Sequence, residues 1–186
     1  KIGEGGQGAV FRTTDPNLII KIKINQITGE PLKVSKEEYE IYRNSIDDIR
    51  VLAISNKVNI AKHINVLRYP YCGYTMLMLQ DMEPIKNIMI VPNHLSLSKF
   101  YIKTGGLKKR LALLTKISMY LMLLHSEGIV YGDISPENIF VSESTDTVWL
   151  IDSDNLRHVL NFNKTIITQG YTAPELYKNI STNTLF

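Results

Sequence analysis

The sequence predicts an α+β protein with two lobes, the first rich in β-strands with one main helix and the second mostly helical. Within residues 1–24, the stretches KIG, GAVFR and LIIKIKI have the composition of short strands and are separated by turn signals. Residues 34–49 and 107–125 instead repeat apolar side chains at helical intervals. Strands thus dominate the first part of the chain, and we expect the lobes to join near residues 78–83.

Bulk composition narrows the class of protein. The chain has 186 residues, 44% of them hydrophobic, and a formal net charge of +3, which is too small to indicate nucleic acid as a partner. The longest apolar stretch, 111–124, is too short to span a bilayer and contains Lys116. A single cysteine, Cys72, excludes an internal disulfide and favours a reducing compartment, so we expect a cytoplasmic location.

The order of predicted elements divides the chain into three segments. INVLRYPY and YTMLMLQ are typical of strands, whereas the stretch 81–104 is compatible with loop or short helix. After the helix at 107–125 come three short β-type segments, IVYGD, IFVSE and VWLID. We therefore expect a first lobe at 1–78, a hinge at 79–83 and a partial second lobe at 84–186.

The helix predicted at 34–49 carries an unusual carboxylate. Glu38 shares a face with Ile41, Tyr42 and Ile49, which would bury it among apolar residues. Because a buried charge without a partner is costly, Glu38 requires a nearby cation.

GEGGQGAV at 3–10 places Gly3, Gly5 and Gly8 in a G-x-G-x-x-G-x-V pattern. Glycines allow the main chain to approach phosphates closely. A dinucleotide site uses nearly the same pattern, but there it leads from a strand into a helix. Here the glycines lie between two predicted strands, which favours a loop that covers the phosphates of ATP over a dinucleotide site. An ordinary glycine-rich hairpin remains an alternative.

Two lysines on the third strand are candidates for binding phosphate. Lys21 and Lys23 alternate onto the same face, so strand geometry alone does not distinguish them. Lys21 is favoured because the residue two positions earlier, Ile19, is apolar and suited to cover a base. Glu38 is its natural ion-pair partner. Both lysines could instead be solvated charges on a strand, which would leave Glu38 unexplained.

The stretch IVYGDISPENIF places Asp133 after an apolar strand and Asn138 shortly beyond it. Together with this stretch, the chain contains five motifs: GEGGQGAV, IIKI, YGDISPEN, WLIDSDN and YTAPEL. They occur in the order found in protein kinases. The chain resembles the protein kinase superfamily over nearly its whole length. It also resembles bacterial protein kinases of the eukaryotic serine/threonine type that carry Gly-Asp in the catalytic loop.

The resemblance implies catalytic and metal-binding roles. Asp133 would accept the proton of the acceptor hydroxyl, and Asn138 and Asp152 would hold the Mg²⁺ ions that accompany ATP. Lys21, paired with Glu38, would position the phosphates, so the catalytic set is Asp133, Lys21, Glu38 and Asn138.

The resemblance also implies which residues contact ATP. The glycine-rich loop would cover the phosphates, apolar side chains would enclose the adenine ring, and the hinge main chain would bond its edge. The residues assigned to the nucleotide are Gly3, Gly5, Gly8, Val10, Ile19, Lys21, Met78, Leu79, Gln80, Asp81 and Phe140. Thr168 lies where the family keeps a threonine near the catalytic Asp.

Several positions depart from the family pattern. Tyr131-Gly132 replaces the usual His-Arg, Ser135 replaces a lysine, and Ser153 replaces the Phe of Asp-Phe-Gly. Without that arginine we expect no switch by activation-loop phosphorylation, while Tyr131 replaces the histidine as a packing residue. The Gly-Asp turn also resembles small-molecule phosphotransferases of the aminoglycoside and choline kinase type.

Three functions therefore follow from the sequence. The favoured one is ATP-dependent transfer of a phosphoryl group to serine or threonine hydroxyls of an unidentified protein. The alternatives are a small-molecule phosphotransferase and a pseudokinase that acts as a binding module. Because the sequence ends shortly after YTAPEL, we also expect helices of the second lobe to be missing and apolar surface to be exposed.

Overall fold

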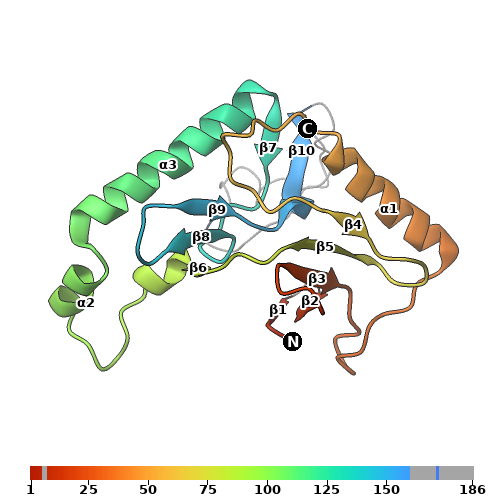
Figure 1. The fold of residues 1–186 in the computed structure, drawn as a ribbon, viewed down its shortest axis with the longest axis horizontal. Coiled ribbons are helices and arrows are strands. Elements are labelled where there is room, and N and C mark those ends of the chain that lie inside the picture. The colour runs from red at the N-terminus through yellow and green to blue at the C-terminus, as the bar shows by residue number, and fades with distance from the viewer. Residues whose placement is uncertain (6–7, 160–170, 172–186) are drawn as a thin grey trace, which may run out of the picture. The chain divides into compact units, whose positions relative to one another are not determined.

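A computed structural model describes residues 1–5, 8–159 and 171 (Figure 1). The chain forms two compact units. The first comprises Lys1–Leu52 with Ala61–Gln80, and the second comprises Ala53–Ile60 with Asp81–Phe186. The predicted boundaries differ from this division, because residues 53–60 group with the second unit rather than with the first lobe.

Main-chain hydrogen bonds explain why this segment belongs to the second unit. The carbonyl of Asn59 accepts the N–H of Leu150 at 2.9 Å, and the Asn59 side chain donates to the carbonyl of Val148 at 3.1 Å. Ile60 also forms a parallel bridge with Leu150. Such long-range pairing is not visible in the composition of the segment.

The first unit is built on an antiparallel five-stranded sheet with strand order β1-β2-β3-β5-β4. Its strands are β1 (Gly3–Gly5), β2 (Gly8–Arg12), β3 (Leu18–Ile22), β4 (Asn65–Val66) and β5 (Gly73–Leu77). The predicted strands are therefore present, although β3, β4 and β5 are shorter than expected. Ala9, Ile22 and Ile24 form a buried cluster with Phe11, Leu67 and Tyr71 packed against it.

Helix α1 (Lys36–Arg50) begins at a capping box. The Ser35 hydroxyl accepts the N–H of Glu38, and the Glu38 carboxylate accepts the N–H of Ser35 at 2.9 Å. The buried side chains are Tyr39, Ile46 and Ile49, while Ile41 is 65% exposed. The prediction that Glu38 lies on the buried stripe is therefore wrong, because the helix is rotated so that Tyr39 and not Glu38 faces the interior.

The second unit contains the long helix α3 and two small sheets in its described part (Figure 1). One sheet has strand order β6-β8-β9 and the other pairs β10 with β7. The elements are β6 (Met82–Pro84), η1 (Ile85–Ile88), α2 (Leu97–Lys103), α3 (Gly106–Ser126), β7 (Ile129–Tyr131), β8 (Ile139–Ser142), β9 (Val148–Leu150), η2 (Ser153–Asn155) and β10 (Leu156–His158). The stretch 81–104 thus holds a strand and two short helices.

Helix α3 matches the predicted helix at 107–125 to within a residue at each end. Its buried side chains are Leu113, Ile117, Tyr120 and Leu124. Leu111 and Leu114, which precede Ile117 at three-residue intervals, are 54% and 57% exposed. Across the described ranges, no helix combines the length and apolar character needed to cross a bilayer.

Candidate active site

The sheet register of the first unit brings four predicted nucleotide residues onto one face. Gly3 pairs with Val10, Val10 with Lys21, and Lys21 with Tyr74, so these residues form a row across the strands. In the next row on the same face, Ile19 lies between Arg12 and Met76. Directly opposed residues project from the same face of an antiparallel sheet. Beside the glycine-rich strands, the face therefore presents several apolar side chains together with the cationic groups of Lys21 and Arg12.

Gly8 opens strand β2 and is held close to strand β3. It has φ of 147°, and a Cβ atom there would lie 2.4 Å from the carbonyl oxygen of Ile22. Any larger residue would push β2 away from β3. Gly3 and Gly5 are the ends of β1, and residues 6–7 of the loop lie outside the described residues.

Lys21 and Lys23 have different surroundings. The Lys21 ammonium lies 5.9 Å from the ring centroid of Tyr74, the residue directly opposite it on β5. The Lys23 ammonium lies 4.9 Å from the ring centroid of Tyr42 on α1. The structure thus assigns Lys23 to the contact with α1 and leaves Lys21 on the face that carries Val10 and Ile19.

Glu38 is engaged in its own helix cap. The N–H and hydroxyl groups of Ser35 lower the pKa of the Glu38 carboxyl, and the positive charge of Lys23 adds to that effect. Within the described residues, the structure does not pair Glu38 with Lys21. The Lys21–Glu38 ion pair thus stays a prediction that requires Glu38 to leave the capping box.

The predicted hinge begins with a residue that is already hydrogen-bonded. The N–H of Met78 donates to the carbonyl of Asn17 at 2.8 Å, extending the β3–β5 ladder by one bond. That N–H is therefore not available to a base, and Leu79, Gln80 and Asp81 remain to supply hinge hydrogen bonds. Asp81 opens the second unit with φ of 53°.

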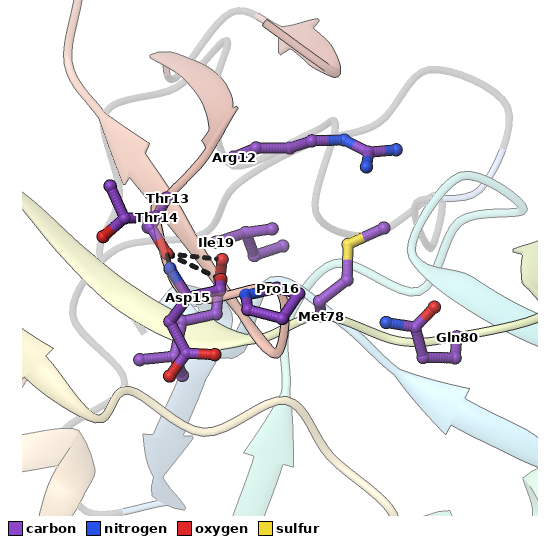
Figure 2. A pocket seen from close by; sticks show the side chains of 9 residues that line it. Arg12, Thr13, Thr14, Asp15, Pro16, Ile19, Met78 and Gln80 are labelled. Atoms are coloured by element: carbon purple, nitrogen blue, oxygen red, sulfur yellow. Dashed lines mark hydrogen bonds between the residues drawn. The ribbon is translucent and has the colours of Figure 1, made fainter.

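A cavity of about 360 Å³ lies at the outer end of the same sheet. Ile19, Met78 and Gln80 line it together with Arg12 and the β2–β3 turn (Figure 2). In Figure 2 the Arg12 side chain extends away from Asp15, and no hydrogen bond or ion pair holds it among the residues that the structure describes. The Asp15 carboxylate instead accepts the N–H of Asn17 at 2.8 Å. This cavity adds Arg12 to the predicted surroundings of the base, a residue that the sequence pattern did not identify.

In the second unit, the catalytic loop joins Asp133 to Asn138. Asp133 is 8% exposed, and the Asn138 amide donates to its carboxylate at 2.8 Å and to its carbonyl at 3.1 Å. The N–H of Asn138 donates to the carbonyl of Ser135 at 3.0 Å, which closes the turn between the two residues. The loop therefore holds a buried carboxylate and an amide in one fixed arrangement.

The metal-binding segment is tied to the same loop. The N–H of Ile151 donates to the carbonyl of Asn138 at 2.9 Å, which places the residue before Asp152 next to the loop. Asp152 has φ of 58° and precedes η2. Phe140, the predicted adenine contact, lies half-buried on β8 opposite Pro84 and Trp149.

Tyr131 lies at the centre of these contacts. Its hydroxyl donates to the carbonyl of Ile151 and lies 3.4 Å from the carbonyl of Asn138. Burial raises the pKa of Tyr131 well above its ordinary value, and the negative charges of Asp152, Asp133 and Asp154 add to the rise. The sequence identified Tyr131 as a packing residue, and its hydroxyl function was missed because nothing in the pattern reveals the partner.

The donor set fits a magnesium–nucleotide site. Mg²⁺ takes oxygen ligands and is usually bound by one or two carboxylates together with substrate phosphates. Because the Asn138 nitrogen donates to Asp133, its amide oxygen is directed elsewhere, and Asp152 supplies a carboxylate from the adjoining segment. In sites of this kind, oxygens of the nucleotide phosphates supply further ligands to the metal. Thr168 and all of YTAPEL except Tyr171 lie outside the described residues.

Comparison with known proteins identifies the family. The sequence model of the protein kinase domain matches residues 1–184, and the chain belongs to the protein kinase family. It is 27% identical to serine/threonine-protein kinase PCRK1 of Arabidopsis thaliana over 94% of this chain and 42% of that protein. It is 29% identical to cyclin-dependent kinase E-1 of the same plant, over 95% of this chain and 38% of that protein.

A bacterial relative matches a shorter region. Serine/threonine-protein kinase PknG of Mycobacterium leprae (strain TN) is 38% identical over 81 residues, which is 41% of this chain and 10% of that protein. The chain spans less than half of the length of each of these relatives. The family and the kinase-type fold expected from the motifs are confirmed.

Proposed function

We propose that the protein is an ATP- and Mg²⁺-dependent protein kinase that phosphorylates serine or threonine hydroxyls of protein substrates. The observation that carries this proposal is the bond from Asn138 to the buried carboxylate of Asp133. Family membership supports phosphoryl transfer, and the names of the relatives support serine or threonine as the acceptor. The low net charge gives no reason to expect nucleic acid, and a cytoplasmic location is proposed from composition alone.

The chain's own residues have separate tasks in this reaction. Asp133 accepts the hydroxyl proton of the substrate as the hydroxyl oxygen bonds to the γ-phosphorus, and the bond to the bridging oxygen of ADP breaks. Asn138 holds the Asp133 carboxylate in place for that transfer. Asn138 and Asp152 would hold Mg²⁺, which neutralises charge on the phosphates. Lys21 orients the phosphates from the glycine-rich face of the sheet.

Two observations concern the alternative functions, a small-molecule phosphotransferase and a binding module. Gly132, which the sequence shares with small-molecule phosphotransferases, is tied by its N–H to the carbonyl of Asn155 at 2.9 Å. A Cβ atom at Gly132 would lie 3.2 Å from that same oxygen, so the Gly-Asp turn is matched to its surroundings. Glu38 in its capping box is compatible with a binding module that does not use the Lys21 ion pair.

The test is transfer of labelled γ-phosphate from Mg·ATP by the full-length protein and by Asp133→Asn. Mixed proteins are offered in one reaction, and small alcohols and aminoglycosides in another. Label on serine or threonine of protein, lost in Asp133→Asn, supports the proposal. Label on small molecules establishes the phosphotransferase alternative, and ATP binding without any transfer establishes the binding module.

A further inference from the structure

Tyr131 occupies a buried position between the catalytic loop and the metal-binding segment. It is the last residue of β7, is 3% exposed, and pairs with Leu156 on β10. Its hydroxyl donates to the carbonyl of Ile151. Ile151 directly precedes Asp152, so this bond acts on the main chain of the predicted metal ligand.

The bond belongs to a closed set of hydrogen bonds. Ile151, held by the Tyr131 hydroxyl, donates its own N–H to the carbonyl of Asn138 at 2.9 Å. Asn138 in turn donates its amide to Asp133, two residues beyond Tyr131. These hydrogen bonds connect four residues: Tyr131, Ile151, Asn138 and Asp133.

Two main-chain hydrogen bonds hold the predicted metal-binding segment on its C-terminal side. The N–H of Gly132 donates to the carbonyl of Asn155 at 2.9 Å, and the N–H of Asn155 donates to the carbonyl of Asp152 at 3.3 Å. Asp152 is thereby held from both directions along the chain, through Ile151 and through Asn155. Of the hydrogen bonds named here, the one from Tyr131 is made by a side chain to the main chain of Ile151.

A packing role alone would not require the hydroxyl. Phenylalanine fills nearly the same volume, but it would leave the partly buried Ile151 carbonyl without this donor. Some residues hydrogen-bond to a metal ligand without contacting the metal. Removing such a residue typically lowers metal affinity or activity by about 10- to 100-fold.

We propose that Tyr131 is a positioning residue whose hydroxyl holds Ile151 and thereby sets Asp152 at the correct separation from Asn138 and Asp133. The inference rests on the proposed function, because it assigns Asp152 and Asn138 to the magnesium–nucleotide site. Tyr131 itself touches neither substrate nor metal in this arrangement. Its effect is transmitted through the main chain at residues 151–152.

The test compares Tyr131→Phe with Tyr120→Phe in the full-length protein. Tyr120 is a matched control because it is also buried in the second unit, on α3, and its hydroxyl is hydrogen-bonded to Asn59. Three quantities are measured: kcat and KM for ATP, the affinity for ADP with and without Mg²⁺ by calorimetry, and the thermal unfolding midpoint. Amide hydrogen exchange at residues 151–155 is followed in parallel.

We expect Tyr131→Phe to lower kcat by about 10- to 100-fold with KM for ATP nearly unchanged. The gain in ADP affinity caused by Mg²⁺ should shrink by a similar factor, while ADP binding without metal is retained. Tyr120→Phe should change only the unfolding midpoint. Wild-type kcat and Mg²⁺ dependence in Tyr131→Phe would overturn the inference, as would equal losses in both variants.

A different result would show that the proposed function is wrong. If the wild-type protein neither binds ADP nor transfers phosphate, the kinase proposal is rejected regardless of the variants. Hydrogen exchange then decides the inference about Tyr131. Faster exchange at residues 151–155 in Tyr131→Phe supports the tie to Ile151, and unchanged exchange there overturns it.

Discussion

The side-chain amide of Asn138 lies 2.8 Å from the carboxylate of Asp133, five positions earlier in the chain. Asp133 is 8% exposed, so this hydrogen bond acts in a region where solvent screens charges weakly. A carboxylate with a fixed donor keeps one orientation, as the proposed role of Asp133 toward a substrate hydroxyl requires. The spacing between the two residues is therefore a structural requirement of the loop.

Replacing Asn138 by alanine should reduce phosphoryl transfer by about 100-fold or more, because it removes both the holder of Asp133 and a predicted metal ligand. The measurement is kcat/KM for ATP at saturating Mg²⁺. Asn87→Ala is the matched control, since the Asn87 amide also donates to a carboxylate, that of Glu83, at 2.8 Å but on the surface. Equal activity in the two variants would remove Asn138 from the proposed mechanism.

Substituting Lys21 and substituting Lys23 should have different effects on nucleotide binding and on stability. Lys21→Met should abolish the binding of Mg·ATP, because Lys21 lies in the row with Val10 on the face that the predicted nucleotide residues share. Lys23→Met should cost up to about 1 kcal/mol of stability through the lost contact with Tyr42, and should retain nucleotide binding.

Nucleotide titration and urea unfolding of both lysine variants provide the measurement. The two variants serve as controls for each other, since the same substitution is made two positions apart. If Lys23→Met lost nucleotide and Lys21→Met retained it, the phosphate-binding role would pass to Lys23. The sequence left that alternative open on strand geometry alone.

The elements were predictable from the sequence because their signals are local. The strands GAVFR and VWLID have β-type composition, and α3 was found to within a residue at each end from its apolar repeat. The buried faces of the helices were harder to predict, since Tyr39 competes with Ile41 on α1 and Leu113 competes with Leu114 on α3. A helix with apolar residues on more than one side can bury either, and packing against the rest of the fold decides.

The site was predictable only as a set of residue types at fixed intervals. Asp133, Asn138 and Asp152 were predicted from motif spacing, and the structure brings Asn138 next to Asp133 and to the residue before Asp152, while their roles stay predictions. The hydroxyl role of Tyr131 was not predicted, because its acceptor Ile151 is 20 positions away and is a main-chain carbonyl, which any residue type provides. Glu38 was assigned to a buried pair, whereas its local bond with Ser35 satisfies it at the start of the helix.

Two neighbouring leucines on α3 test the observed packing. Leu113 is 1% exposed and Leu114 is 57% exposed. Leu113→Ala should cost about 3 kcal/mol of unfolding free energy because it opens a cavity, whereas Leu114→Ala should stay within about 0.5 kcal/mol. The substitution and helix are the same, so helix propensity cancels in the comparison. Urea unfolding measures both, and similar losses would mean that α3 is rotated relative to the structure.

The capping box of α1 should make stability depend on pH through Glu38. The pKa of Glu38 is lowered from its ordinary value of 4.5, chiefly by the Ser35 N–H, so folding favours the ionised form. The stabilisation is therefore fully present above pH 4.5 and is lost as the pH falls through the lowered pKa of the folded state.

Two variants test the capping box. Glu38→Gln keeps an acceptor at this position but cannot titrate, so its stability should lack this dependence on pH. Ser35→Ala should cost about 1 kcal/mol of stability at neutral pH. Urea unfolding of the three proteins between pH 3 and 7 measures both effects. Parallel curves for wild type and Glu38→Gln would show that the carboxylate does not occupy the cap in solution.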